Sequence, residues 1–237
     1  EDTPLLDLAA GVLGSGRASR LYRAVRERQL AASVSAYNYT PTDLGVFVVH
    51  ADMPAASAVP AAGAIWHQVR ALREDGVLPQ ELVRAQRMFE SRWLRHLESV
   101  EGQATHLAEW EALGDWQLGD RYYERITSAT PTAVTDAVER YLTPDRAGWV
   151  VYRPATSSAL AEDAASARAL LDGARVAPLP ALGGVADTTA PAALARLDLE
   201  REDGAVRIYR TATGIPVLVR RRAGAPITHV GLYVLGG

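Results

Sequence analysis

The sequence predicts an α+β fold in which an antiparallel sheet is flanked by a block of helices. Long segments carry apolar residues at helical spacing, which indicates amphipathic helices. Short runs of β-branched and aromatic residues, bounded by turn residues, indicate strands. The helix-forming and strand-forming segments are grouped along the chain instead of alternating. This grouping favours α+β over an alternating α/β architecture.

The first elements are two helices joined by a glycine turn. Residues 5–13 have helical spacing, Gly14-Ser15-Gly16 interrupts it, and residues 19–25 resume it. We expect Ser19 to cap the second helix. The glycine turn superficially resembles a phosphate-binding loop, but it follows a helix instead of a strand and no lysine follows it. A plain turn is therefore favoured.

A strand pair follows, at residues 33–40 and 46–51, with turn residues at 41–45. Because side chains alternate along a strand, Tyr37 and Tyr39 are predicted to lie on the same face.

A helical block comes next, and a strand at residues 148–152 is expected to close the unit. The block is predicted at residues 55–74, 79–99, 102–113, 118–128 and 131–142. In its last helix Thr130 is the expected N-cap and Pro131 the first helical residue.

The sequence divides into three parts. Residues 1–154 form the predicted domain, and residues 155–204 form a linker that is poor in core-forming residues, with one short helix near residues 158–171. Its extended portion is marked by Pro178, Pro180 and Gly183-Gly184. Residues 205–237 are expected to begin a second, truncated sheet, with strands at 206–210, 215–219 and 228–235.

Composition excludes several classes of function. The chain has 237 residues, 48% of them hydrophobic, and a net charge of −3, which argues against binding to nucleic acid or to a membrane. Without cysteine there are no disulfides, thiolate nucleophiles or cysteine zinc ligands, and the compartment stays open between cytoplasm and periplasm. All 25 basic residues are arginine. We attribute this to coding bias and expect a bacterial source.

Two stretches resemble the pitrilysin/insulinase family of zinc metallopeptidases. Leu13 to Tyr22, Arg26 to Ala31 and Ser33 to Ala36 are similar to that family's second domain, with its Gly-Gly-x-x-Ser-Arg-Leu helix start and Leu-Ala-x-Ser-Val strand. Later motifs resemble it in order: Glu98 to Ala104, Gly114 to Trp116, Thr130-Pro131 and Tyr141 to Pro144. Residues 209–219 resemble the first hairpin of the next homologous half, with Ala212-Thr213 in place of the family's Asn.

The resemblance implies a processing-peptidase-like metallohydrolase fold, cut from a longer protein, with the linker at a hinge between two halves. It also implies a zinc-bearing parent that closes a chamber around a peptide substrate. The partners would be the missing zinc-bearing and C-terminal domains of the same protein. Association between copies of the chain is a further expectation, because those domains would leave an apolar face and a sheet edge uncovered.

The family's zinc motif, His-x-x-Glu-His, is missing from the sequence. None of the five histidines has a second histidine one helical turn away. The nearest match is His106-Leu107-Ala108-Glu109-Trp110, which we interpret as an exposed His and Glu on an amphipathic helix. We therefore expect no metal site in this chain, no catalytic residue, and no activity of the chain alone.

Three residues are candidates for substrate binding: Arg26, Tyr37 and Tyr39. The family often places an Arg and a Tyr seven positions apart against the substrate, and Arg26 occupies the Arg position. Ser33 stands seven residues on, so the pair is broken here. Tyr37 and Tyr39 could line a substrate chamber, or they could pack in a core or an interface.

Three hypotheses of function follow. The chain is a non-catalytic segment of a zinc-dependent endopeptidase that contributes chamber wall and hinge. Alternatively, it belongs to a catalytically inactive, processing-peptidase-like subunit with a structural or peptide-binding role. A third reading is an independent α+β interaction domain with an accidental likeness, which the ordered series of motifs disfavours.

Overall fold

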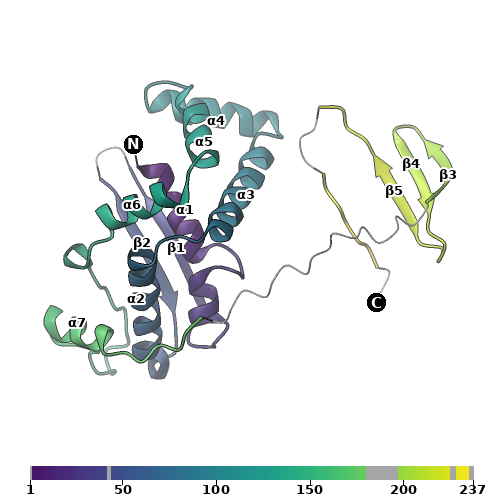
Figure 1. Cartoon of the computed structure of the whole chain (residues 1–237). Coiled ribbons are helices and arrows are strands. Elements are labelled where there is room, and N and C mark those ends of the chain that lie inside the picture. Colours follow the sequence, from purple (N-terminus) through teal and green to yellow (C-terminus); the bar gives the residue numbers. More distant parts are fainter. Residues whose placement is uncertain (1, 42–43, 180–196, 225–227, 235–237) are drawn as a thin grey trace. The chain divides into compact units, whose positions relative to one another are not determined.

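A computed structural model describes residues 2–41, 44–179, 197–224 and 228–234 (Figure 1). The chain forms two compact units, residues 1–180 and residues 181–237.

The centre of the first unit is α1 (Thr3–Gly14), which packs against a two-stranded antiparallel sheet (Figure 1). The sheet consists of β1 (Ser33–Tyr39) and β2 (Val46–Asp52), with register from Ser33 opposite Asp52 to Tyr39 opposite Val46. Its inner face packs on the core through Val34, Ala36, Phe47 and Val49. Helix α1 is apolar nearly all round and is buried along most of its length, as expected for a central helix.

The predicted helical block is confirmed. It comprises η2 (Ala55–Ser57), α2 (Ala58–Glu74), α3 (Pro79–His96), α4 (Val100–Ala112), α5 (Leu118–Thr127), α6 (Pro131–Tyr141) and η3 (Pro144–Arg146). The hydroxyl of Thr130 accepts a hydrogen bond from the amide of Ala133 at 3.2 Å, which confirms the predicted cap of α6. These helices complete the core around α1 with Leu72, Leu82, Ile126, Val134 and Val138.

The turn after α1 requires glycine at position 14 because of packing and favours it at position 16 because of backbone conformation. A Cβ on Gly14 would lie 2.3 Å from the amide nitrogen of Ala36, so only glycine lets the end of α1 approach β1 this closely. Gly16 has φ of +78°, which favours glycine. The turn leads through Arg20 and Leu21 into a π-helical turn, η1 (Tyr22–Arg26).

The expectation that Ser19 caps this helix is wrong. Its hydroxyl is buried and has no hydrogen-bond partner among the described residues. The tight turn places the side chain inside the protein instead of over the free amides of the helix start.

The strand predicted at residues 148–152 is also wrong. These residues have no regular structure, and Val150 and Tyr152 are 93% and 102% exposed. A strand needs a hydrogen-bonded neighbour, and in the described part of the first unit the sheet consists of β1 and β2 alone.

The short helix predicted within the linker is present as α7 (Ala164–Asp172), and it packs against α2. The indole nitrogen of Trp66 donates to a carboxylate oxygen of Asp172 at 2.7 Å. Beyond α7, the guanidinium of Arg28 donates to the carbonyl oxygens of Ala177 and Pro178 at 3.0 and 2.5 Å. The chain is thus held on the first unit as far as residue 179. Pro180 and Gly183-Gly184 lie outside the described residues, and the division at 154 and 204 stays a prediction.

The second unit contains a three-stranded antiparallel sheet in the order β3 (Asp198–Asp203), β4 (Val206–Arg210) and β5 (Pro216–Arg220). The strands predicted at 206–210 and 215–219 are confirmed. Strand β3 was not predicted, and it lies in the segment assigned to the linker. The strand predicted at 228–235 is wrong over its described residues, 228–234, which have no regular structure.

Candidate functional site

The three candidate substrate-binding residues lie on β1 and on the turn that leads into it. Tyr37 and Tyr39 share the outer face of β1, as predicted, and are 49% and 61% exposed, so neither packs in the core. Arg26 ends η1, an element that contacts β1, and is also exposed. No hydrogen bond or ion pair joins Arg26 to either tyrosine in the described structure. The structure therefore brings the two tyrosines together, while Arg26 lies on a separate element.

The outer face of the β1–β2 sheet combines aromatic, apolar and polar side chains. Tyr37 lies opposite Val48, and Tyr39 lies opposite Val46, which is 54% exposed. Farther along the sheet, the Ser33 hydroxyl donates to the Asp52 carboxylate at 2.6 Å. Such a surface can pack against apolar side chains and also offer hydrogen bonds.

His106, the nearest match to a zinc ligand, is buried, whereas the sequence predicted an exposed side chain. Its ring meets Trp93 edge-on, with centroids 4.8 Å apart, and lies 6.2 Å from the ring of Trp110. The side of α4 that carries His106 and Trp110 packs against aromatic rings of α3 and α5. The burial of His106 depends on these distant residues, so the local sequence pattern did not predict it. Glu109, on the same helix, is exposed as expected.

Among the described residues, no three His, Cys, Asp or Glu side chains lie close enough to hold a metal ion. Over the same residues, no helix is both long and apolar enough to cross a membrane.

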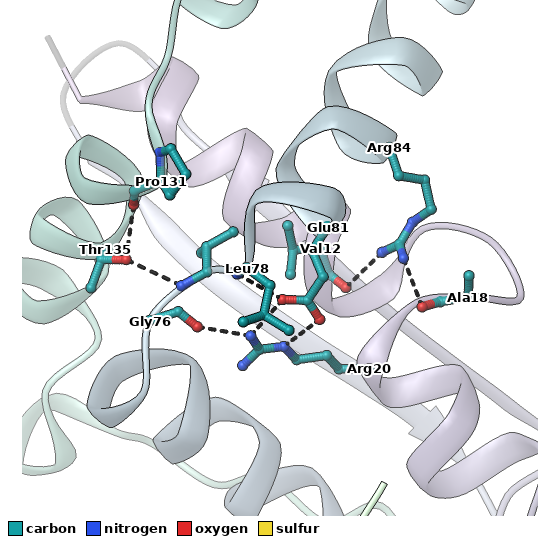
Figure 2. Close-up of polar contacts among 10 residues, drawn as sticks. Val12, Ala18, Arg20, Gly76, Leu78, Glu81, Arg84, Pro131 and Thr135 are labelled. Carbon is teal, nitrogen blue, oxygen red and sulfur yellow. Dashed lines mark hydrogen bonds and ion pairs between the residues drawn. The ribbon is translucent and has the colours of Figure 1, made fainter. Parts of the chain in front are cut away.

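The best-formed polar cluster of the first unit surrounds Arg20, the arginine of the Ser-Arg-Leu motif (Figure 2). Its guanidinium donates to the two carboxylate oxygens of Glu81 at 2.9 and 2.6 Å and to the carbonyl oxygen of Gly76 at 2.8 Å. The Arg20 and Glu81 side chains are 7% and 3% exposed. This bidentate pair fixes the η1 segment to the start of α3.

Neighbouring groups complete the bonding of this cluster. The amide of Leu78 donates to Glu81 at 3.1 Å, and the hydroxyl of Thr135 accepts from the amide of Val77 at 3.2 Å (Figure 2). Burial alone would raise the pKa of Glu81, but the hydrogen bonds and charge of Arg20, with the Leu78 amide, hold that pKa below its usual value. Glu81 is therefore ionised at neutral pH.

A second carboxyl, the partly buried Asp7 on α1, accepts a hydrogen bond from the Tyr122 hydroxyl of α5. Burial raises the pKa of Asp7, while Tyr122, the nearby Asn38 side chain and the charge of Arg92 offset part of that rise. Neither carboxyl was a candidate site residue from the sequence. Pro79 followed by Glu81 at the start of a predicted helix was a usable signal for Glu81.

Comparison with known proteins agrees with this geometry. The sequence model of the peptidase M16 inactive domain matches residues 1–89. The mitochondrial-processing peptidase subunit alpha of Caenorhabditis elegans is 30% identical over 137 residues, which are 56% of this chain and 26% of that protein. The chain thus spans about a quarter of the length of this curated relative.

Solved structures share the fold of the first unit. The inactive peptidase domain of a protein assigned as a zinc protease in Bordetella parapertussis is 26% identical, with a TM-score of 0.56 over 61% of this chain and 79% of that chain. A structure assigned as a zinc protease from Bordetella pertussis Tohama I is 27% identical, with a TM-score of 0.53 over 61% of this chain and 81% of that chain. The peptidase M16 inactive domain of Pseudomonas fluorescens, 20% identical and with a TM-score of 0.52 over 60% of this chain and 34% of that one, supports the fold alone.

The sequence match at residues 1–89, the α+β fold of the first unit and the structures that share it agree with the resemblance inferred from the motifs. Residues 1–89 match the peptidase M16 inactive domain, and the chain resembles solved inactive-domain structures of zinc proteases in fold.

Proposed function

We propose that this chain is a non-catalytic segment of a longer zinc-dependent peptidase, in which the first unit contributes wall to a chamber that holds a peptide. Zinc and the catalytic residues would belong to other domains of that protein. The predicted linker, residues 155–204, would lie at the hinge between its halves.

The observation that carries this proposal is the exposed outer face of β1 and β2. One face of that sheet is covered by α1, while the other presents Tyr37 and Tyr39, about half exposed, beside Val46. An exposed aromatic and apolar surface on a rigid sheet is suited to contacting the side chains of an extended peptide.

The alternative is a catalytically inactive, processing-peptidase-like subunit with a structural or peptide-binding role. The similarity to a processing-peptidase subunit supports it. The same surface would then bind peptide without cleavage by the protein itself.

The experiment replaces both tyrosines, Tyr37→Ser with Tyr39→Ser, in the longer protein that carries this segment. If their face contacts substrate equally in the ground state and the transition state, KM for peptide rises and kcat changes little. Losing two aromatic contacts predicts a rise of about 5–50-fold in KM.

The matched control is Tyr141→Ser, which removes an exposed tyrosine from the end of α6, a different element of the first unit. It should leave KM unchanged. Equal KM values for the double variant and the unsubstituted protein would contradict a peptide-facing role for this surface. A protein that binds peptide through these tyrosines but cleaves none would favour the alternative.

A further inference from the structure

The cluster around Glu81 contains more positive charge than the ion pair uses. Arg20 takes both carboxylate oxygens of Glu81. Arg84, on the next turn of α3, donates to the carbonyl oxygens of Ala18 and Val12 at 2.8 and 3.5 Å (Figure 2). These carbonyls satisfy hydrogen bonds of Arg84 but supply no counter-charge.

Arg23 adds a third guanidinium to this region. It lies on η1 and is 8% exposed, and its side chain makes no hydrogen bond or ion pair with any described residue. Its charge acts on Arg84: burial lowers the pKa of Arg84, the charge of Glu81 offsets this, and the charges of Arg23 and Arg20 lower it further. The charge of Glu81 is therefore shared by Arg20 and Arg84, and Arg23 adds positive charge near Arg84 without acting on Glu81.

Donors without partners gather in the same place. The Nε of Arg84 and the hydroxyl of Ser19 are both buried and have no hydrogen-bond partner among the described residues. Ser19 lies next to Ala18, whose carbonyl oxygen binds Arg84, and its own carbonyl oxygen accepts from the amide of Arg23 at 3.2 Å. A buried guanidinium without a counter-charge costs free energy that a bound anion would offset.

We propose that Arg23, together with Arg84 beside the Arg20–Glu81 pair, forms a binding site for one oxyanion group. The occupant is a carboxylate or a phosphate, because guanidinium groups bind both through paired N–H donors. It comes either from free phosphate or from an acidic side chain of another segment of the protein. The π-helical turn η1 is the element that presents Arg23, and such turns are frequent at functional sites.

The test measures the melting temperature of the full 237-residue chain during titration with inorganic phosphate and, separately, with acetate, at constant ionic strength. A specific site gives a saturable rise, of roughly 3–6 °C at about ten times the Kd, with at least one probe. A larger response to phosphate identifies a free phosphate as the source, and a larger response to acetate identifies an acidic side chain.

Arg23→Gln is the diagnostic variant, and Arg87→Gln is its control, because Arg87 is an exposed residue of α3 paired with Glu90. The rise should disappear in Arg23→Gln and persist in Arg87→Gln. Without added anion, Arg23→Gln should melt at the same or a higher temperature, because it removes an uncompensated charge.

Three results would overturn the proposal. They are the absence of a rise with either probe, an equal rise in Arg23→Gln, or a lower melting temperature of Arg23→Gln in anion-free buffer. The last would mean that Arg23 already has a structural partner within the chain.

Discussion

Arg20 and Glu81 form a buried ion pair whose role is to connect segments of the first unit. The two residues are 61 positions apart, and their hydrogen bonds join the motif after α1 to the loop before α3. The Ser-Arg-Leu motif that pointed to the family thus has a structural use in this chain. Its arginine is too deeply buried to contact a substrate.

Breaking this pair from one side should be strongly destabilising. We predict that Arg20→Ala lowers the free energy of unfolding by about 3–5 kcal/mol, because it leaves the Glu81 carboxylate buried without a counter-charge. The double variant Arg20→Met with Glu81→Leu should lose less free energy of unfolding than the sum of the losses of Arg20→Met and Glu81→Leu alone. Urea denaturation measures the free energy of unfolding of each variant. The exposed pair Arg87 and Glu90 is the control, and its loss should cost no more than about 0.5 kcal/mol.

The same pair predicts acid sensitivity. Because the pKa of Glu81 is lower in the folded chain than in the unfolded one, its contribution to stability is present above the unfolded pKa, about 4.3. It is lost as the pH falls through the folded pKa. Unfolding free energies measured from pH 7 to pH 2.5 should show this loss, and Glu81→Gln should flatten that part of the profile. An unchanged profile would contradict the assignment.

Gly14 gives a steric prediction. Gly14→Ala places a Cβ 2.3 Å from a backbone nitrogen of β1, so we expect a loss of about 2 kcal/mol or more in the free energy of unfolding. Gly148→Ala is the matched control, because its Cβ would meet nothing within 4 Å. Equal stability of the two variants, measured by thermal unfolding, would show that α1 does not need its close approach to β1.

Single side chains were predictable from the sequence only where local geometry decides them. The alternation of β1 placed Tyr37 and Tyr39 on one face, and Thr130 caps α6 as predicted. The surroundings of Ser19 and His106 depend on residues far away in the sequence, so their burial could not be derived from local pattern. The pairing of Arg20 with Glu81 could not be predicted for the same reason, because the two residues are 61 positions apart.

At the scale of elements, helices were easier to predict than strands. Helices α1 to α6 carry their own hydrogen bonds and a clear apolar period. A strand depends on its neighbour: residues 148–152 have strong β-forming composition but no partner strand, whereas β3 is charged and exposed yet forms. Strand β3 is stabilised by pairing with β4, including the ion pairs Glu200–Arg210 and Glu202–Arg207. The Asp203-Gly204 turn was the one local signal for it.

Helix α7 provides the prediction at this scale. Asp172 accepts from Trp66 and pairs with Arg70 and Arg168, so it is the main polar contact between α7 and α2. Asp172→Ala should increase amide hydrogen exchange in residues 164–173 at least severalfold and leave α1 unchanged, because local opening is separate from global unfolding. Glu162→Ala, an exposed change just before α7, is the control. Unchanged exchange in Asp172→Ala would mean that apolar packing alone holds α7.

At the scale of the molecule, the chain combines a first unit, whose residues 1–89 match the peptidase M16 inactive domain, with a second, small sheet unit. The first unit contains the buried Glu81 and the partly buried Asp7, and each carboxyl group is engaged with a neighbouring side chain. In the described residues no set of three metal ligands is assembled. The proposed function assigns the zinc of the longer protein to its other domains.

Elemental analysis of zinc, on this chain and on the longer protein that contains it, tests this account most directly. We predict less than about 0.1 zinc per molecule of this chain, because structural and catalytic sites need three or four ligands. We predict about one zinc per molecule of the longer protein. Zinc absent from both would favour the inactive processing-peptidase-like subunit. Tight, stoichiometric zinc on this chain, abolished by His106→Ala, would contradict the account.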